Sequence, residues 1–387
     1  MKIFLFSRGW PSEREPQRGS FEHDQAMALT QLGHQVIVLN VDARFRKYHR
    51  KYGVTEMHSE GIAIYSLFAG SVWGKALRMI SPGLHVKMKR GLFLYLYNKV
   101  VKREGSPDVI YAHYLGQCSG AIAIKKKYGI PVVGIEHWSE LAYESIKNNV
   151  KYIARKTYKE LDLLLTVSSS LRENIKKVFG VDSVVVNNMV GQEFLEGFSI
   201  TRNEVKSEKF NFIAVGNLLP VKGYDILIKA FAKSELAKKE CALTIVGEGK
   251  ERQHLEELIR ETGQEDSITL PGRKPRREII KVLNESDAFV LSSRSETFGV
   301  ACIEALSQGL PAIATRCGGT EDIINDKNGI LIDSDNVDAL AEALCKMYEH
   351  CEKYDSGKIA EDCRNRFAPE VIAKQLEKLL GSVVLNS

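Results

Sequence analysis

Short apolar runs, many of them β-branched, alternate with longer helical stretches along nearly the whole chain. Continuous apolar runs are typical of strands buried on both faces of a parallel sheet, and strands that alternate with helices form doubly wound α/β sheets. A chain of 387 residues is too long for one ordinary core. The pattern therefore predicts two Rossmann-like domains. The runs are KIFLFS, HQVIVLNV, IAIYSLF, DVIYAHY, PVVGIEH, LLLTVSS and SVVVNNM in the first half, and NFIAVGN, ALTIVGEG, SITLPG, DAFVLSS, PAIATRC and GILIDS in the second.

The boundary between the two predicted domains falls near residues 191–211, where the apolar periodicity stops and charge rises. We accordingly predict a first domain over residues 1–195 and a second over 205–367. A final helix, within RFAPEVIAKQLEKLLGS, follows the last strand of the second half. From its pattern alone, this helix could pack on either domain.

Several classes of protein are disfavoured by the composition. No apolar run approaches the roughly 20 residues that span a bilayer, and the first ten residues resemble a β-strand more than a signal peptide. The seven cysteines include no CxxC pair, which favours reduced thiols in the cytoplasm. The nine histidines show no ligand spacing with those cysteines, so we expect no zinc site.

Positive charge is concentrated in residues 44–103. That segment holds thirteen Lys and Arg against Glu56 and Glu60, whereas the whole chain has a net charge of only +5. The basic residues are interleaved with apolar and aromatic ones, a mixture that can bind an anionic membrane surface or a phosphate-bearing acceptor. The alternative is a solvated helix face. Binding to nucleic acid is less favoured, because no recognition motif accompanies the charge.

The stretch SRSETFGVACIEALSQGLP, residues 293–311, combines the end of a strand, a loop and a helix. Ligands of open α/β sheets bind where strands end and helices begin. Backbone N–H groups of Phe298, Gly299 and Val300 stand at the helix start and can meet an anion. Glu296 and Glu304 flank them, and carboxylates accept hydrogen bonds from sugar hydroxyls. The arrangement fits a nucleotide-sugar, although a glutamate near a helix start is more often a surface residue.

The same stretch resembles the signature of glycosyltransferase family 4, the retaining transferases of the GT-B fold. That signature is a Glu, seven residues, a second Glu, a G-x-P and a GG-x-x-E. SETFGVACIEALSQGLPAIATRCGGTED contains the first three parts, and its GGTED has Glu321 one position earlier than the last part requires. VGNLLPVKGYDILIKAF, IVGEGKERQHLEELI, LPGRKP and VVVNNMV are similar to further family segments in the expected order. The resemblance implies two Rossmann-like domains that face each other across a cleft, with a C-terminal helix, residues 368–387, that crosses back to the first.

The resemblance also implies roles for residues of the second half. Glu304 would bind the ribose hydroxyls, Glu296 the donor sugar, and the amides of Phe298, Gly299 and Val300 the sugar and diphosphate. Lys222 matches the lysine that neutralises the donor phosphates. Asn217 stands where the family usually has an arginine. Its charge could be replaced by one of three arginines, namely Arg294, Arg273 or Arg316.

The first half resembles the family more loosely. Gly19-Ser20 stands in place of a Gly-Gly pair and would approach the donor phosphate or the acceptor. His137, in GIEHWSE, matches a histidine that lies by the reacting sugar, whereas His113 reads as structural. The resemblance thus implies an acceptor-binding first domain and a nucleotide-sugar-binding second domain.

The implied activity is transfer of a sugar from a UDP- or GDP-sugar to a hydroxyl, with retention of anomeric configuration, as in a retaining hexosyltransferase. The commonest setting in the family is surface polysaccharide or glycolipid synthesis on a lipid-linked acceptor, which would place this chain on the inner face of a membrane. The family scheme needs no cofactor and no metal. Two alternatives are a Rossmann dehydrogenase, which the missing GxGxxG disfavours, and a non-catalytic sugar-nucleotide-binding protein of the same fold.

Overall fold

A computed structural model describes residues 1–15, 17–44, 51–71, 80–141, 146–197 and 209–387. The chain divides into two compact units. The first comprises Met1–Met189 and Pro369–Ser387, and the second comprises Val190–Ala368. Each unit contains one largely parallel sheet between helices, which confirms the predicted α/β class.

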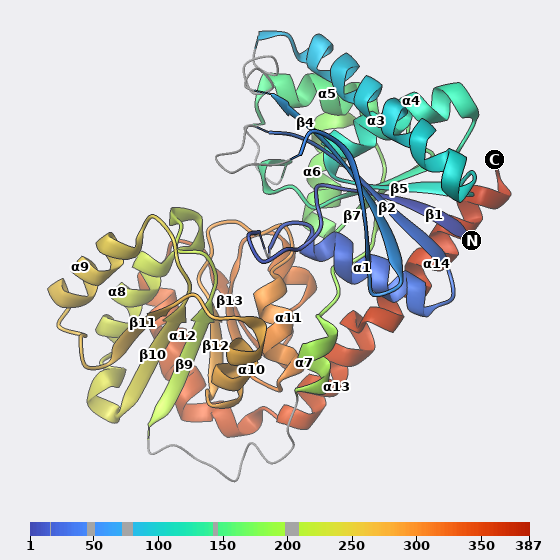
Figure 1. Cartoon of the computed structure of the whole chain (residues 1–387). Coiled ribbons are helices and arrows are strands. Elements are labelled where there is room, and N and C mark those ends of the chain that lie inside the picture. The colour runs from blue at the N-terminus through green and yellow to red at the C-terminus, as the bar shows by residue number, and fades with distance from the viewer. Residues whose placement is uncertain (16, 45–50, 72–79, 142–145, 198–208) are drawn as a thin grey trace. The chain divides into compact units, whose positions relative to one another are not determined.

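The first unit contains a sheet in the order β3-β4-β2-β1-β5-β6-β7-β8. Helices α3 and α4 pack together over one face, and α1 and α14 pack together on the other (Figure 1). Its elements are β1 (Lys2–Ser7), α1 (Ser20–Gln31), β2 (Gln35–Arg44), β3 (Gly53–Ser59), β4 (Ile62–Ser71), α3 (Pro82–Glu104), β5 (Val109–His113), α4 (Tyr114–Tyr128), β6 (Val132–Glu136), η1 (Ser139–Leu141), α5 (Asn148–Tyr158), β7 (Leu163–Thr166), α6 (Ser169–Phe179), β8 (Val184–Val185) and α14 (Pro369–Leu385).

The second unit contains a sheet in the order β11-β10-β9-β12-β13-β14. Helices α8, α9 and α12 bury their apolar faces in one core on this sheet. Its elements are α7 (Gln192–Glu196), β9 (Phe210–Val215), η3 (Pro220–Lys222), α8 (Tyr224–Ser234), η4 (Leu236–Lys239), β10 (Cys241–Val246), α9 (Arg252–Glu261), β11 (Ile268–Gly272), α10 (Arg276–Asn284), β12 (Ala288–Leu291), α11 (Val300–Ser307), β13 (Ala312–Arg316), η5 (Gly319–Asp322), β14 (Gly329–Asp333), α12 (Val337–His350), η6 (Cys351–Lys353) and α13 (Ser356–Phe367).

All thirteen predicted strands are present, but the sequence analysis missed β3. This strand lies at the edge of the sheet and pairs antiparallel with β4. Its residues, GVTEMHS, are mostly exposed, so they lack the apolar run that identifies a buried strand. Glu60 and Gly61 join the two strands with φ values of 52° and 79°, as a tight hairpin turn requires.

The chain passes from one unit to the other earlier than predicted. The first domain was expected to reach residue 195, yet Val190 and the residues after it belong to the second unit. Gln308 Nε2 donates a hydrogen bond to Phe194 O at 2.5 Å, and Asn284 Nδ2 donates one to Gly197 O at 3.1 Å. These contacts hold α7 against the second unit. Most of the predicted linker, residues 198–208, lies outside the described residues.

The final helix, α14, belongs to the first unit, as the family resemblance implied. It contacts α1 and β5, and Gln375 Nε2 donates a hydrogen bond to Val185 O at 3.2 Å. All seven cysteines are free thiols. In the part of the chain that the structure describes, no helix is both long and apolar enough to cross a bilayer. The same part contains no group of three or more His, Cys, Asp or Glu arranged to hold a metal ion.

Candidate functional site

Each sheet contains one place where the strand order reverses direction, and ligands of doubly wound sheets bind beside such places. In the second unit the reversal lies between β9 and β12, and in the first unit between β1 and β5. We call the residues that follow these strands the second-unit and first-unit switch points. Lys222 follows β9 and Glu296 follows β12, whereas Gly19 follows β1 and His113 ends β5. The motif residues therefore collect where the fold places ligands.

The loop after β12 leads into α11 as the sequence predicted. Gly299 is the N-cap residue with φ 104°, a left-handed conformation that favours glycine. Phe298 is buried, and its ring packs edge-on against Phe367 with centroids 5.7 Å apart, so its side chain serves the core while its backbone stays at the loop. Val300 opens the helix, and Glu304 lies half-buried one turn further on.

Lys222 and Glu296 form an ion pair at the second-unit switch point. Lys222 Nζ lies 2.5 Å from Glu296 Oε1, and the side chains are 26% and 14% exposed. Ser293 Oγ also donates a hydrogen bond to Glu296 Oε1 at 2.9 Å. The structure thus brings together two residues that the sequence placed 74 positions apart. A cation, a carboxylate and a helix N-terminus are joined in one half-buried site.

The short helix that carries Lys222, η3, is fixed against the loop after β12. Ser292 Oγ donates to Lys222 O at 3.0 Å, and Arg294 N donates to Val221 O at 2.7 Å. Gly223 follows Lys222 with φ 64°, and a Cβ there would lie only 2.1 Å from Ser292 O. The glycine after the lysine therefore permits the two loops to touch.

Arg294 forms hydrogen-bonded ion pairs with two neighbouring carboxylates. Its two terminal nitrogens bind Asp225 at 2.9 and 2.8 Å, and its Nε binds Asp335 Oδ1 at 2.6 Å. Nη1 also donates to Pro220 O. Burial opposes ionisation of Asp225, but the hydrogen bonds from Arg294 outweigh it and lower the pKa of that carboxyl. The guanidinium thus clamps the start of α8 and the turn of η3.

The other residues considered for phosphate charge lie at the ends of neighbouring strands. Asn217 is exposed in the loop after β9, and its carbonyl accepts a hydrogen bond from Leu219 N at 2.8 Å. Arg273 is exposed directly after β11. Arg316 is exposed at the end of β13, with Nε 3.9 Å from Asp333 Oδ1.

At the first-unit switch point, Gly19 begins α1 against the backbone that leaves β1. Its φ of 78° is left-handed, and a Cβ there would lie 2.2 Å from Gly9 O. Any larger residue at position 19 would push the two segments apart. Gly19, which remains from the family's Gly-Gly pair, is therefore the glycine that the close approach of the α1 N-terminus to Gly9 requires.

His137 and His113 lie together in the first unit. Their rings are parallel, with centroids 5.3 Å apart, and Phe21 stacks on the far side of His137 at 5.7 Å. Both histidines are buried; the His113 ring has no hydrogen-bond partner among the described residues, whereas the His137 ring lies beside the Asn188 side chain. Burial lowers the pKa of His137 well below its ordinary value, and burial with nearby Arg8 lowers the pKa of His113 to about 3. The sequence analysis read His113 as structural, but it belongs to the same cluster.

Three further residues of this cluster were missed. Arg8 Nε lies 3.1 Å from the fully buried Glu22 Oε1, and the Arg8 guanidinium sits 3.6 Å from the centroid of the Tyr114 ring. Tyr114 has a φ of 65°, a strained conformation for a large residue. Arg8 could have been found as the first residue after a buried strand. No sequence signal identifies Glu22 as buried or Tyr114 as left-handed.

Glu136 was also missed, although it immediately precedes His137. It is fully buried and accepts four hydrogen bonds: from Leu115 N and Tyr158 Oη at 2.8 Å each, and from His137 N and Trp138 N at 3.1 Å each. Burial raises the pKa of Glu136 to about 7 even though these donors favour the carboxylate. This side chain fixes the backbone on both sides of His137.

Comparison with known proteins identifies the two halves separately. Residues 22–193 match the family model described as Glycosyltransferase Family 4, and residues 198–360 match the one described as Glycosyl transferases group 1. A putative teichuronic acid biosynthesis glycosyltransferase from Bacillus subtilis is 27% identical over 384 residues, which cover 94% of this chain and 92% of that protein.

Solved structures show the same fold. Sucrose-phosphate synthase from Thermosynechococcus elongatus aligns over 100% of both chains, with a TM-score of 0.80 and 17% identity. The Anabaena protein HepE in complex with UDP and glucose aligns over 99% of this chain and 100% of that one, with a TM-score of 0.72 and 19% identity.

Proposed function

Because this chain belongs to the glycosyltransferases of family 4, we propose that it transfers a sugar from a UDP- or GDP-sugar to an acceptor hydroxyl with retention of configuration. The observation that carries the proposal is the Lys222–Glu296 pair beside the N-terminus of α11. Lys222 and the helix N-terminus complement an anionic diphosphate, and Glu296 can accept hydrogen bonds from the hydroxyls of a neutral sugar. We expect the reaction to need no metal, since the cation and the helix N-terminus meet the phosphate charge.

In the proposed reaction, Lys222 and the backbone N–H groups at Phe298, Gly299 and Val300 stabilise the departing diphosphate. Charge grows on that group as the glycosidic bond breaks, so a cation held in place before reaction lowers the barrier. Glu296 accepts hydrogen bonds from the donor sugar. Its present partner, Lys222, would then exchange the carboxylate for phosphate oxygens when the donor binds.

Two further residues of the same unit take part in donor binding, one by direct contact and one by positioning Lys222. Glu304, half-buried on α11, binds the ribose hydroxyls. Arg294 does not replace the arginine that the family has at position 217, because its guanidinium is held by Asp225 and Asp335. We assign Arg294 instead as a positioning residue for Lys222, and Asn217 leaves Lys222 as the main cation.

His137 is the proposed contact to the acceptor or the reacting sugar. Burial keeps the imidazole neutral, and a neutral imidazole offers one donor and one acceptor nitrogen to a hydroxyl. Glu136 holds the backbone that carries it. Gly19 lets the α1 N-terminus approach the same ligand closely.

The setting proposed is surface polysaccharide or glycolipid synthesis at the cytoplasmic face of a membrane, with a carbohydrate or lipid-linked acceptor. Two relatives support it by name. They are the Bacillus subtilis protein above and a putative colanic acid biosynthesis glycosyltransferase from Escherichia coli, 24% identical over 71% of each chain. The HepE complexes with UDP and UDP-glucose support a UDP-sugar donor.

The proposal is tested by incubating the full chain with radiolabelled UDP- and GDP-sugars and following nucleoside diphosphate release and labelled product. Wild type should turn over one donor, and a thermal-shift screen should show the same nucleotide raising the melting temperature. A melting shift without turnover, in the presence of membrane-derived acceptors, would instead identify a non-catalytic sugar-nucleotide-binding protein.

A further inference from the structure

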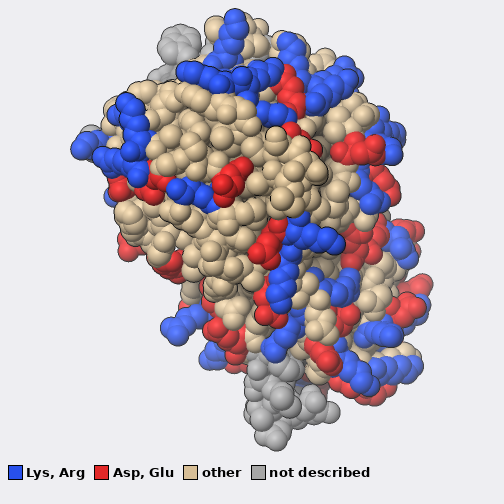
Figure 2. All heavy atoms as spheres, turned by 90° about the vertical axis from the view of Figure 1, so that its right-hand side faces the viewer, with Lys and Arg blue, Asp and Glu red and all other residues tan. Residues whose placement is uncertain are grey.

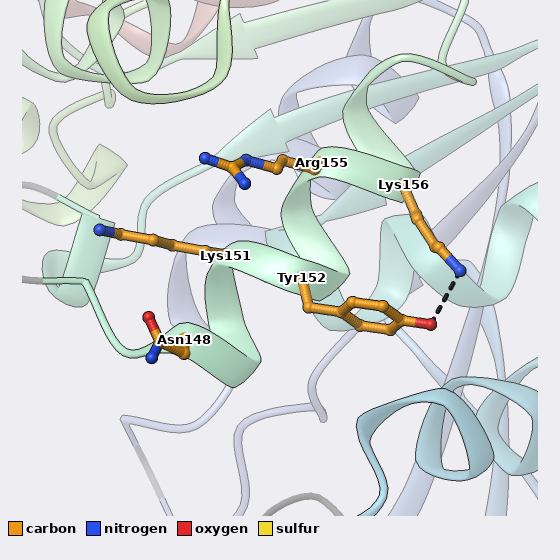
Figure 3. Close-up of a pocket in the computed structure, with 5 residues that line it drawn as sticks. All are labelled: Asn148, Lys151, Tyr152, Arg155 and Lys156. Atoms are coloured by element: carbon orange, nitrogen blue, oxygen red, sulfur yellow. Dashed lines mark hydrogen bonds between the residues drawn. The ribbon is translucent and has the colours of Figure 1, made fainter.

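Helix α5 of the first unit presents a cationic pocket that none of the roles above uses. The pocket has a volume of about 530 Å³ and is lined by Asn148, Lys151, Tyr152, Arg155 and Lys156. Figure 3 shows Lys151 and Arg155, one turn apart, projecting to the same side of the helix. Tyr152 and Lys156 project to the other side, where Lys156 Nζ lies 2.8 Å from Tyr152 Oη. The helix thus spreads three positive charges around one exposed tyrosine.

The charges of α5 are not neutralised locally. The helix contains no Asp or Glu, and within the described ranges Lys151 and Arg155 form no ion pair. Basic residues of neighbouring elements behave differently: Lys125 pairs with Asp162 at 2.7 Å, and Lys176 pairs with Asp182 at 2.7 Å. Unpaired cations clustered on one helix attract an anion from outside the molecule.

Large apolar side chains are exposed beside these charges. Ile80, two residues before α3, and Leu84, in its first turn, are 83% and 52% exposed, and Tyr152 on α5 is 41% exposed. Tyr152 Oη lies 3.4 Å from the place where a Cβ of Gly83 would be, so the two helices adjoin there. Figure 2 shows Lys and Arg side chains gathered at the end of the first unit where Figure 1 places α3 and α5.

We propose that Lys151, Tyr152 and Arg155 of α5, with Ile80 before α3 and Leu84 in its first turn, form a membrane-docking face for a bilayer of anionic phospholipid. Lys and Arg attract lipid phosphates, while single aromatic and aliphatic side chains insert among the headgroups. A free phosphate would use only the cations and leave the apolar side chains in water. The inference rests on the proposed function, since a lipid-linked acceptor brings the enzyme to such a surface.

The cations of this face lie outside the basic segment 44–103 that the sequence indicated, although Ile80 and Leu84 lie within it. Several cations of that segment are already paired within the first unit: Arg44 with Asp42 at 3.1 Å, Arg90 with Glu160 at 3.7 Å, and Arg103 with Glu56. Five others, at positions 46, 47, 50, 75 and 78, lie outside the described residues. The structure describes further lysines of that segment, and Lys87 and Lys102 on α3 form no ion pair within the described ranges. Lys151 and Arg155 add cations on a helix some 45 residues beyond the segment, where composition gave no signal.

The test is co-sedimentation of the full chain with vesicles of phosphatidylcholine alone or mixed with phosphatidylglycerol. Wild type should bind only the mixed vesicles, and salt should weaken the binding. The double variant Lys151→Glu/Arg155→Glu should bind at least tenfold less, because each basic residue near an anionic surface contributes about fivefold. The matched control is Lys374→Glu/Lys378→Glu, the same charge change at the same spacing on exposed positions of α14, and it should bind as wild type.

The apolar part of the face is tested by Leu84→Ser/Tyr152→Ser, which should reduce vesicle binding severalfold at high salt, where electrostatic attraction is screened. Equal loss in the α14 control, or unchanged binding in the α5 double variant, would overturn the proposal. So would displacement from vesicles by inorganic phosphate at equal ionic strength, which would identify a phosphate pocket. UDP binding is measured on every variant. Loss of lipid binding with UDP binding intact concerns this face alone, whereas a wild type that binds lipid but turns over no donor contradicts only the proposed function.

Discussion

The two switch points occupy equivalent places in their sheets but differ in the chemistry of their side chains. In the second unit, a lysine and a glutamate meet in a half-buried ion pair that substrate groups can replace. In the first unit, two neutral histidines stack in the interior beside a salt bridge between the partly exposed Arg8 and the buried Glu22. The second-unit site is a single ion pair that we propose substrate groups displace, whereas the first-unit site places uncharged imidazoles beside a salt bridge that is already made.

This difference matches the two halves of a glycosyl transfer. A departing diphosphate gains charge, and preorganised charges stabilise it. A sugar hydroxyl gains little charge until late, and fixed neutral groups can orient it. The comparison therefore assigns electrostatic work to the second unit and positioning to the first, and each prediction below tests one side of that division.

Lys222→Ala should give the largest effect, a loss of turnover of roughly 100-fold or more, the scale seen when a preorganised charge-stabilising group is removed. Donor binding, measured by titration with the UDP-sugar, should weaken less than turnover, because ground-state charge is smaller than transition-state charge. Lys222→Arg should recover part of the loss, since it keeps the charge and changes its geometry. Near-normal turnover in Lys222→Ala would show that Lys222 does not stabilise the departing diphosphate.

Glu304→Ala should weaken nucleotide binding by about 1–3 kcal/mol, the scale of hydrogen bonds to a charged group. The melting temperature without ligand should stay close to that of wild type, because the side chain is half-buried and α11 is held by Phe298 and Cys302 in the core. Calorimetric titration with UDP measures the change. If the variant binds UDP as tightly as wild type does, Glu304 is only a helix residue.

Arg294→Ala should lower turnover roughly tenfold by freeing the turn that carries Lys222. If Arg294 acts through Lys222, the double variant Lys222→Ala/Arg294→Ala should be little worse than Lys222→Ala alone. Arg294→Lys should rescue poorly, since lysine cannot bind Asp225 through two nitrogens. Arg277→Ala, at an exposed arginine on α10 of the same unit, is the control and should retain turnover. Additive losses in the double variant would show that Arg294 contacts the substrate itself.

The same comparison explains what the sequence could predict. The residues of the second-unit switch point lie in two contiguous motifs, and local rules place each after a strand and before a helix. Their ion pair needed only the fold to bring the motifs together. The first-unit cluster joins Arg8, Glu22, His113 and His137 from four separate segments, and its character depends on the burial of Glu22 and the two histidines. Burial of a glutamate in a helix, or a left-handed tyrosine, is decided by tertiary packing and leaves no periodic signal.

The smallest predicted effect concerns the neutral histidines and the pH dependence of stability. The pKa of His113 is lowered to about 3, so as pH falls below the ordinary value near 6.5 the unfolded chain takes up a proton that the folded chain does not. The stability that the neutral His113 contributes is thus fully present above pH 6.5 and is lost progressively as pH falls from 6.5 toward 3. Between pH 7.5 and 5.5 the free energy of unfolding of His113→Phe should therefore fall by about 1 kcal/mol less than that of wild type.

Urea unfolding followed by tryptophan fluorescence measures this effect, because Trp10, Trp73 and Trp138, the only three tryptophans, all lie in the first half of the sequence. The raised pKa of Glu136 acts in the opposite direction between about pH 4.5 and 7, but it is common to both proteins and cancels in their difference. His58→Phe, at an exposed position on β3, is the matched control and should leave the pH dependence as in wild type. If His113→Phe keeps the full wild-type loss on acidification, His113 is charged in the folded state. The first-unit switch point would then be an electrostatic site like its counterpart.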